Sequence, residues 1–302
     1  MTRCLVIGKH GQVAQALAAV GGADVYAASR EETDLRDADT LRRALDRHRP
    51  AFVINAGGFT KVDAAESEPD EAQALNVTGP EALARACSDA GAVLIHLSTD
   101  CVFDGRKASP YLASEVPNPL GVYGRTKLEG EQAVLAAVPQ SLVVRVSWVF
   151  SRYAGNFVRT MLTAAQKRPV VTVVSDQIGG PTYAPDLARA LLNMGEQAAE
   201  PGFAGWGLYH LAGDDTIGRA DMARRIFEVS ARLGGPVAEV TDILTADFPT
   251  PAERPLNARL DMRETARVFG VEIPDWMPGL ETTVKALIAE LAPPGQGAGK
   301  AG

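Results

Sequence analysis

The chain has 302 residues, of which 46% are hydrophobic and 22% charged, a composition typical of a folded globular protein rather than a disordered one. Its 30 basic and 37 acidic side chains give a net charge of −7, and such a surface repels the phosphates of nucleic acids and anionic lipids. The composition therefore argues against nucleic-acid and membrane partners. At roughly 150 residues per domain, the length predicts one large domain or two modest ones.

The cysteines Cys4, Cys87 and Cys101 are too few for a disulfide framework and lack the CxxC spacing of a zinc site. The four histidines also lack the HxH or HxxxH spacing of metal ligands. We therefore expect no bound metal and a protein of the reducing cytoplasm. The apolar run 4–7 is too short for the core of a signal peptide and is predicted to be the first strand.

Short apolar runs alternate with helical spacing through the first half, and consecutive apolar residues are typical of strands buried on both faces. This alternation predicts an α/β fold, a Rossmann-like doubly wound parallel sheet. The predicted strands are 4–7, 24–28, 52–55, 93–97 and 142–146, and the predicted crossover helices are 41–48, 80–90 and 126–137.

Proline and glycine become frequent after residue 150, for example at 179–181 and 249–251. We expect an NAD(P)-binding domain over 1–150 and a smaller substrate-binding α/β domain over 151–292. A helical stretch at 186–194, within a segment near 182–200, is expected to return to the sheet. The last residues, 293–302, are rich in Pro and Gly and are predicted to form a disordered tail.

Gly8, Gly11 and Ala14 follow the first predicted strand with GxxGxxA spacing. Small residues there let the N-terminus of the next helix approach a pyrophosphate, and the spacing resembles the loop of the short-chain dehydrogenase/reductase superfamily. The alternative is a glycine turn that only joins a strand to a helix. Its place after the first strand favours dinucleotide binding.

The second predicted strand ends in Ser29 and Arg30. An acidic residue at this place binds the ribose of NAD, whereas a hydroxyl and a guanidinium suit the 2′-phosphate of NADPH. The sequence therefore favours NADPH. NADH stays possible because Glu31 and Glu32 follow directly, and Arg30 could instead be a solvated loop residue.

Tyr123 and Lys127 are four residues apart, which places both on one face at the start of a predicted helix. An ammonium beside the phenol would lower its pKa from about 10 and favour proton donation to a carbonyl oxygen. Ser98 and Thr99 end the fourth predicted strand, at the sheet edge where ligands bind. The alternatives are an exposed helix face for the pair and turn residues for the hydroxyls.

Seven motifs occur together, at 8–12, 55–66, 97–105, 118–127, 145–150, 176–182 and 254–255. In this combination the sequence resembles the dTDP-4-dehydrorhamnose reductases of the extended short-chain dehydrogenase/reductase superfamily, from the N-terminus to about residue 290. The resemblance implies an NAD(P)H-dependent oxidoreductase that reduces the C4 ketone of dTDP-4-dehydro-6-deoxy-L-mannose to dTDP-L-rhamnose. The product would serve a cell-surface polysaccharide.

The resemblance also implies roles for individual residues. Tyr123 would donate the proton, Lys127 would hold the nicotinamide ribose and tune Tyr123, and Thr99 would align the carbonyl. The implied cofactor-binding residues are Gly8, His10, Gly11, Gln12, Val13, Ser29, Arg30, Asp34, Leu35, Asn55, Ala56, Gly57, Thr60, Ser98, Tyr123 and Lys127. The implied substrate-binding residues are Asp100, Cys101, Trp148, Asn156 and Arg254.

Some of these residues have plainer interpretations. Trp148 could be a core tryptophan, Arg254 could form a surface salt bridge, and the acidic stretch 63–68 could be a solvated helix face. His96 and His210 lie in apolar runs and are expected to be core histidines with satisfied hydrogen bonds, while His10 lies in the glycine loop and could touch a phosphate.

Two positions depart from the family pattern. Members usually have Tyr where this chain has Cys101, so a hydrogen bond to the substrate is lost or replaced, unless Cys101 is only a small buried residue. Some bacterial members dimerise through a metal held partly by a glutamate of the first helix, where this chain has Ala16. We expect no such metal bridge, and either a monomer or a homodimer.

Three alternatives share the fold. A reductase of a different nucleotide-linked 4-keto-6-deoxy sugar fits the same motifs. A 4,6-dehydratase needs a glutamate where Cys101 stands, which argues against it. A non-catalytic NADP-binding regulatory subunit is compatible with Tyr123 and Lys127, since a relative of the family binds a methionine adenosyltransferase. Turnover of a keto-sugar nucleotide would separate the reductase from the regulator.

Overall fold

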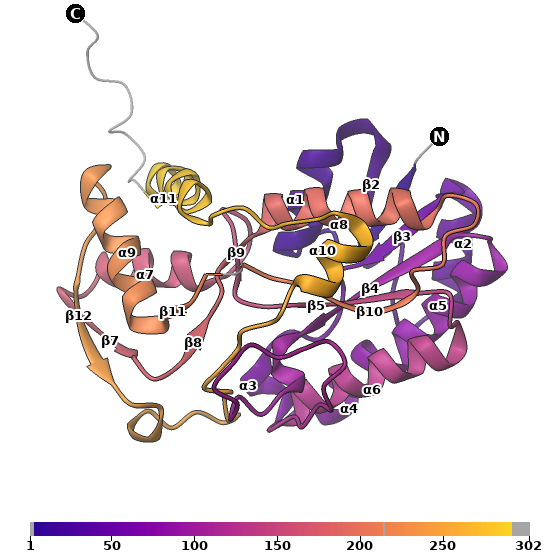
Figure 1. Ribbon diagram of the computed structural model, residues 1–302. Helices are drawn as coiled ribbons and strands as arrows, with labels where there is room; N and C mark the ends of the chain where they lie inside the picture. Colours follow the sequence, from indigo (N-terminus) through magenta and orange to yellow (C-terminus); the bar gives the residue numbers. More distant parts are fainter. Residues whose placement is uncertain (1–2, 214, 292–302) are drawn as a thin grey trace, which may run out of the picture.

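A six-stranded parallel sheet organises the computed structural model, which describes residues 3–213 and 215–291 (Figure 1). The strand order is β10-β5-β4-β3-β1-β2, and every neighbouring pair is parallel. The order reverses between β1 and β3, which places a ligand crevice at their carboxyl ends. The strands are β1 (Cys4–Ile7), β2 (Val25–Ala28), β3 (Phe52–Asn55), β4 (Val93–Thr99), β5 (Leu142–Val146) and β10 (Gly207–Leu211).

Helices cover both faces of this sheet. Every residue of β1 and of β3 is therefore buried. Leu17 of α1 and Leu191 of α8 pack with Val6 on one face. Leu41 of α2, Leu83 of α5 and Val134 of α6 pack on the other. The helices are α1 (Gln12–Gly21), α8 (Ala184–Ala198), α2 (Ala38–His48), α5 (Gly79–Asp89) and α6 (Val122–Ala137).

A further hydrophobic core lies beside the sheet, on the left of Figure 1, where Phe150, Leu162, Ile226 and Leu280 are buried together. It is built from α7 (Phe157–Ala165), α9 (Arg219–Arg232), α11 (Met277–Leu291) and β7 (Val170–Val174). Three two-stranded sheets lie around it and pair β7 with β12 (Glu239–Ile243), β8 (Ile178–Gly179) with β11 (Ile217–Gly218), and β6 (Val149–Phe150) with β9 (Thr182–Tyr183).

Several short helices complete the elements. They are the α-helices α3 (Val62–Ala65), α4 (Pro69–Gln73) and α10 (Arg263–Phe269), the 3-10 helices η1 (Gly22–Asp24), η3 (Asp100–Val102) and η4 (Thr245–Asp247), and the π-helix η2 (Ala74–Thr78). Within the described residues, no helix has the length and apolar character needed to cross a membrane.

The strand predictions are confirmed at 4–7, 52–55 and 142–146. The second strand starts one residue later than predicted, because residues 22–24 form η1, and the fourth continues to Thr99. The expectation of five strands was too low for this sheet, since β10 from the second half pairs with β5.

The helix predictions have similar outcomes. The helix expected at 126–137 begins four residues earlier, at Val122, so Tyr123 lies in its first turn. The stretch 186–194 is helical as predicted, within α8, which packs against α1. The predicted tail 293–302 lies outside the described residues.

Candidate active site

Two adjoining cavities, of about 320 and 480 Å³, lie at the carboxyl ends of β1, β3 and β4. The glycine loop and the segment after β3 line both, through His10, Gly11, Ala56, Gly57 and Thr60. They therefore form one continuous cleft, with Arg30, Asp34 and Leu35 at one end and Thr99, Tyr123 and Lys127 at the other. The cleft thus brings the glycine loop, the segment after β3 and the Tyr123–Lys127 pair onto one continuous surface.

The glycine loop packs closely against the segment after β3. Gly8 has a φ of +99°, and a Cβ atom there would lie 2.9 Å from both Cα and N of Gly57. The Gly11 N–H donates to the Gly8 carbonyl at 2.8 Å, which closes the turn. Among the residues that the structure describes, no side chain caps the N-terminus of α1, so its first N–H groups are available to an anion.

Asn55 fixes the segment after β3 from within the core. It is fully buried, and its Oδ1 accepts the Gly57 N–H at 3.1 Å while its Nδ2 lies 3.0 Å from Nδ1 of His96. The amide Nδ2 can only donate, so Nδ1 of His96 accepts, and the ring proton of neutral His96 is then assigned to Nε2. Burial holds the pKa of His96 well below its usual value.

Lys127 is buried and tied to the end of β4. Its Nζ donates to the Leu97 carbonyl at 2.7 Å and lies 3.4 Å from Nε2 of His96. Burial lowers the pKa of Lys127 to about 8, and the nearby charge of Glu131 opposes the change. Because the pKa of Lys127 lies close to neutral pH, the protonation of its amine can change when a charge forms beside it.

Thr99 and Tyr123 lie together in the wider cavity. The Thr99 hydroxyl donates to Oδ1 of Asp100 at 2.8 Å, and Ser147 donates to Oδ2 of the same carboxylate at 2.8 Å. Burial raises the pKa of Tyr123, with further rises from the charges of Cys101 and Asp100, while Thr99 opposes the rise. The lowered Tyr123 pKa predicted from its spacing to Lys127 is therefore wrong for this structure, because burial is the largest influence on the pKa of this phenol.

A buried ion pair supports this end of the cleft. Arg145 of β5 contacts Glu131 of α6 through two hydrogen bonds, of 2.8 and 2.6 Å, and both side chains are 2% exposed. The Ser98 hydroxyl donates to the same carboxylate. Sequence reasoning missed this pair, although the four-residue spacing from Lys127 to Glu131 was a signal that both face the sheet.

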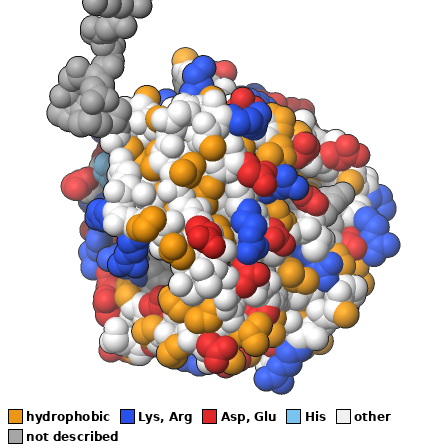
Figure 2. Space-filling model, turned by 90° about the vertical axis from the view of Figure 1, so that its left-hand side faces the viewer, with side chains coloured by type: hydrophobic (Ala, Val, Ile, Leu, Met, Phe, Trp, Pro, Cys, Tyr) orange, Lys and Arg blue, Asp and Glu red, His pale blue; other side chains and the backbone are white. Residues whose placement is uncertain are grey.

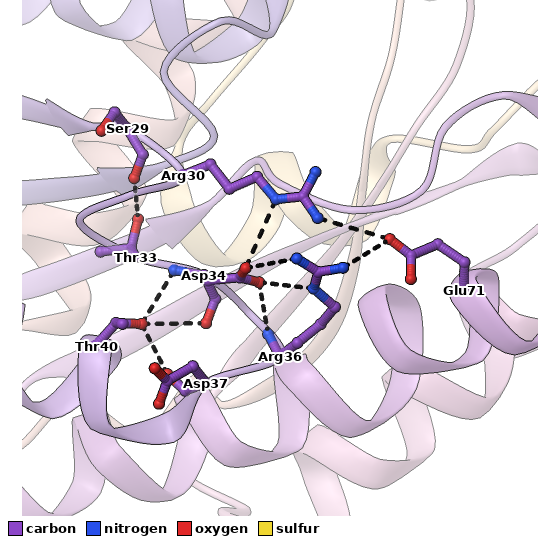
Figure 3. Close-up of polar contacts among 8 residues, drawn as sticks. All are labelled: Ser29, Arg30, Thr33, Asp34, Arg36, Asp37, Thr40 and Glu71. Carbon is purple, nitrogen blue, oxygen red and sulfur yellow. Dashed lines mark hydrogen bonds and ion pairs between the residues drawn. The ribbon is translucent and has the colours of Figure 1, made fainter.

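The opposite end of the cleft carries a network of charged residues (Figure 3). Arg30 is 58% exposed and lies 3.6 Å from Asp34 and 3.7 Å from Glu71, whereas Arg36 approaches the same carboxylates to 2.7 and 3.3 Å. Hydrogen bonding to Arg36 lowers the pKa of Asp34 to about 2. Arg36 thus satisfies both carboxylates, and Arg30 is held only loosely beside the cavity.

The neighbouring acidic residue is turned away from the cavity. Glu32 accepts hydrogen bonds from the Tyr26 hydroxyl at 2.6 Å and from the Ser29 N–H at 3.0 Å. The Thr33 hydroxyl donates to the Ser29 carbonyl at 3.0 Å (Figure 3). Ser29 itself is not among the residues that line the cavity, although Arg30 is.

The structure separates the predicted substrate residues. Trp148 and Asp100 line the wider cavity, and Trp148 has a φ of +42°, which is unusual for a bulky side chain. Asn156 instead caps α7, where it accepts from the Arg159 N–H at 3.2 Å and donates to the Ser151 carbonyl at 2.6 Å. It does not line the cavity.

Arg254 forms a salt bridge with Asp63 at 2.8 Å, which was the alternative to substrate binding. Like Asn156, it does not line the cavity. The acidic stretch 63–68 is therefore more than a solvated face. Its Glu66 accepts the Val122 N–H at 2.8 Å, at the first residue of α6.

Cys101 is partly buried beside Thr99, and burial raises the pKa of its thiol.

The core histidines also differ from each other. His96 has a partner for Nδ1 in the Asn55 amide, and its Nε2 lies 3.4 Å from Nζ of Lys127. The expectation is wrong for His210 of β10, whose two ring nitrogens have no hydrogen-bond partner within the described part of the chain. Among those residues there is also no group of three or more His, Cys, Asp or Glu side chains placed to hold a metal ion.

This parallel sheet, with its glycine loop and a Tyr–Lys pair beside Thr99 on one cleft, defines a Rossmann-fold oxidoreductase of the short-chain dehydrogenase/reductase type. A family model described as the RmlD substrate binding domain matches residues 2–289. The dTDP-4-dehydrorhamnose reductase of Sinorhizobium fredii is 40% identical over 291 residues, which cover 95% of this chain and 98% of the relative. The chain belongs to the dTDP-4-dehydrorhamnose reductase family.

Solved structures agree with this assignment. The dTDP-4-dehydrorhamnose reductase of Clostridium acetobutylicum is 31% identical with a TM-score of 0.85, and covers 94% of this chain and 99% of its own. The enzyme of Bacillus anthracis, solved in complex with NADP, is 30% identical with a TM-score of 0.85, and covers 93% and 98%. The predicted resemblance, the α/β fold class and the oxidoreductase class are all confirmed.

Proposed function

We propose that this protein reduces the C4 ketone of dTDP-4-dehydrorhamnose with NADPH and produces dTDP-L-rhamnose. The observation that carries the proposal is the single cleft on which Thr99, Tyr123 and Lys127 lie together with the glycine loop. The names of the relatives and the NADP bound to the Bacillus anthracis enzyme support the substrate and the cofactor. NADH remains the second candidate cofactor.

The residues of the cleft fit a dinucleotide. The tight Gly8–Gly57 approach and the uncapped N-terminus of α1 leave room and N–H donors for a pyrophosphate. When bound, NADPH supplies a hydride to C4 of the sugar. We propose that the residues that hold it are Gly8, His10, Gly11, Gln12 and Val13 at the pyrophosphate, Ser29, Arg30, Asp34 and Leu35 at the adenosine, and Asn55, Ala56, Gly57, Thr60, Ser98, Tyr123 and Lys127 toward the nicotinamide.

The acid step is assigned to Tyr123. Its phenol gives a proton to the C4 oxygen as that oxygen gains negative charge, and Thr99 orients the carbonyl beside it. The Lys127 ammonium stabilises the phenolate that remains and binds the nicotinamide ribose. The raised Tyr123 pKa suits a group that must stay protonated until the substrate arrives. The residues proposed to bind the substrate beside Tyr123 are Asp100, Cys101 and Trp148.

Asn156 and Arg254 are not kept as direct substrate contacts, because their side chains are already engaged. We propose that residues 1–150, with a returning segment near 182–200, bind the cofactor, and that residues 151–292 complete the substrate site. The free thiols of Cys4, Cys87 and Cys101 support a cytoplasmic enzyme, which acts as a monomer or homodimer.

The test is oxidation of NADPH by the purified protein with dTDP-4-dehydrorhamnose, and the absorbance of the reduced nicotinamide reports turnover. NADH and a UDP-linked keto sugar are run in parallel. We expect rapid oxidation with the dTDP sugar and NADPH, and dTDP-rhamnose as the product. Tight NADPH binding with no turnover of either sugar would reject the reductase and favour a regulatory subunit.

A further inference from the structure

Arg219 is the first residue of α9, directly after β11. Strand β11 pairs with β8, and the Arg219 N–H donates to the Gln177 carbonyl at 2.9 Å. Strand β8 in turn bridges to Asn257, a few residues after Arg254. The backbone of Arg219 is therefore fixed by β8, and β8 also contacts the segment that follows Arg254.

The guanidinium of Arg219 stacks on the tryptophan of the site. Its Cζ lies 3.5 Å from the centroid of the Trp148 ring and 4.8 Å from that of Phe157. Trp148 lines the wider cavity and also lies against Gly179, where a Cβ atom would come within 2.5 Å of the indole. The indole is thus fixed between a glycine and a cation, and the stack holds the guanidinium plane in a defined position.

The charge of Arg219 lacks a direct partner. Within residues 3–213 and 215–291, its side chain makes no hydrogen bond and no ion pair, whereas Arg254 is paired with Asp63. Burial lowers the pKa of Arg219 to about 10, the charge of Asp100 opposes this, and that of Arg254 adds to it. Asp100 is itself engaged by Thr99 and Ser147.

Other arginines of the same helix behave differently. Arg224 is half-buried and Arg225 exposed, and they are paired with the acidic residues Asp221 and Glu228. On the face shown in Figure 2, basic and acidic side chains are likewise interspersed. Arg219 is only partly buried, but a partly desolvated cation without a partner still costs free energy, and an anion bound beside it lowers that cost.

We propose that Arg219 binds the diphosphate of the sugar-nucleotide substrate from its stack on Trp148. This inference rests on the proposed function. The substrate carries its negative charge on the diphosphate alone, and a guanidinium binds two phosphate oxygens at once through its planar set of N–H donors. The sugar of the same molecule then lies toward Tyr123, because Trp148 lines the cavity that holds Tyr123.

The test measures binding rather than turnover. Calorimetric titration with dTDP and with thymidine compares the wild type with Arg219→Met, Arg219→Lys and the exposed control Arg225→Met. We expect Arg219→Met to weaken dTDP binding by about 10- to 100-fold, as loss of charge-assisted hydrogen bonds does. Arg219→Lys should keep part of the affinity, Arg225→Met should match the wild type, and thymidine binding should not change.

Unchanged NADPH binding and a single cooperative thermal unfolding transition show that Arg219→Met is folded. Wild-type affinity for dTDP in this variant, or no dTDP binding by the wild type, would overturn the inference. The proposed reaction is judged separately by turnover. If the wild type binds dTDP through Arg219 but does not reduce dTDP-4-dehydrorhamnose, diphosphate binding by Arg219 is supported and the proposed reaction is rejected.

Discussion

Lys127 donates a hydrogen bond to the carbonyl of Leu97 at 2.7 Å, across from helix α6 to strand β4. The bond joins the helix that carries Tyr123 to the strand that carries Thr99, so it fixes two candidate catalytic groups relative to each other. It also leaves the amine in a buried place where its charge is costly.

The lowered pKa of Lys127 predicts a pH-dependent stability. Between about pH 8 and its ordinary value of 10.5, the unfolded chain keeps a proton on Lys127 that the folded protein has released. This group therefore makes the free energy of unfolding rise with pH in that window. Urea denaturation over the window should show the rise in the wild type relative to Lys127→Met. Parallel curves for the two proteins would contradict the shift.

Removal of the Tyr123 hydroxyl should affect the chemical step. Tyr123→Phe deletes the proposed proton donor and keeps the ring, so we expect kcat to fall by on the order of 10² to 10⁴. The dissociation constant for NADPH, measured by fluorescence, should change far less than kcat, because Tyr123 is one of many residues proposed to hold the cofactor. A variant that retains near-normal kcat would remove Tyr123 from the mechanism.

Arg30 is predicted to select NADPH. It lines the cavity and its two carboxylate contacts are long, so it can turn to a 2′-phosphate. Arg30→Ala should weaken NADPH binding by about 10-fold or more, with a much smaller effect on NADH. Arg42→Ala, which removes an exposed arginine paired with Asp39, is the matched control. Equal weakening of both cofactors would reject a 2′-phosphate contact.

The buried pair of Glu131 and Arg145 should show strong coupling in stability. Arg145→Met leaves Glu131 as an unpaired buried charge, so we expect a loss of about 3–5 kcal/mol. Arg85→Met breaks an exposed pair with Glu81 and should cost at most about 1 kcal/mol. In a double-mutant cycle, Glu131→Leu with Arg145→Met should cost less than the sum of the single changes. Additive losses would show that the two side chains do not interact.

Local patterns in the sequence predicted the central sheet well, because each strand buried on both faces is a continuous apolar run, as at 52–55. The start of α6 escaped prediction because its first N–H is bound by Glu66, far away in the sequence. Strand β10 was not assigned to the sheet because only its pairing with β5 defines it as a sheet strand.

In the candidate site, too, residues marked by local patterns were predictable, whereas residues placed by distant contacts were not. Tyr123, Lys127 and Thr99 all line the wider cavity, and the sequence could single them out because spacing and strand ends are local signals. Asn156 and Arg254 are engaged elsewhere through a helix cap and an ion pair with Asp63. Arg219 carried no local signal, because its position depends on Trp148, which comes from a different strand connection.

Transfer of deuterium is the most direct test of the account. The wild type and Tyr123→Phe are incubated with dTDP-4-dehydrorhamnose and NADPH deuterated at the transferred position, and the sugar product is examined by NMR. We predict one deuterium at C4 of dTDP-rhamnose with the wild type, formed far more slowly by Tyr123→Phe. A wild-type protein that binds both ligands and yields no C4-deuterated sugar would contradict the proposed reductase.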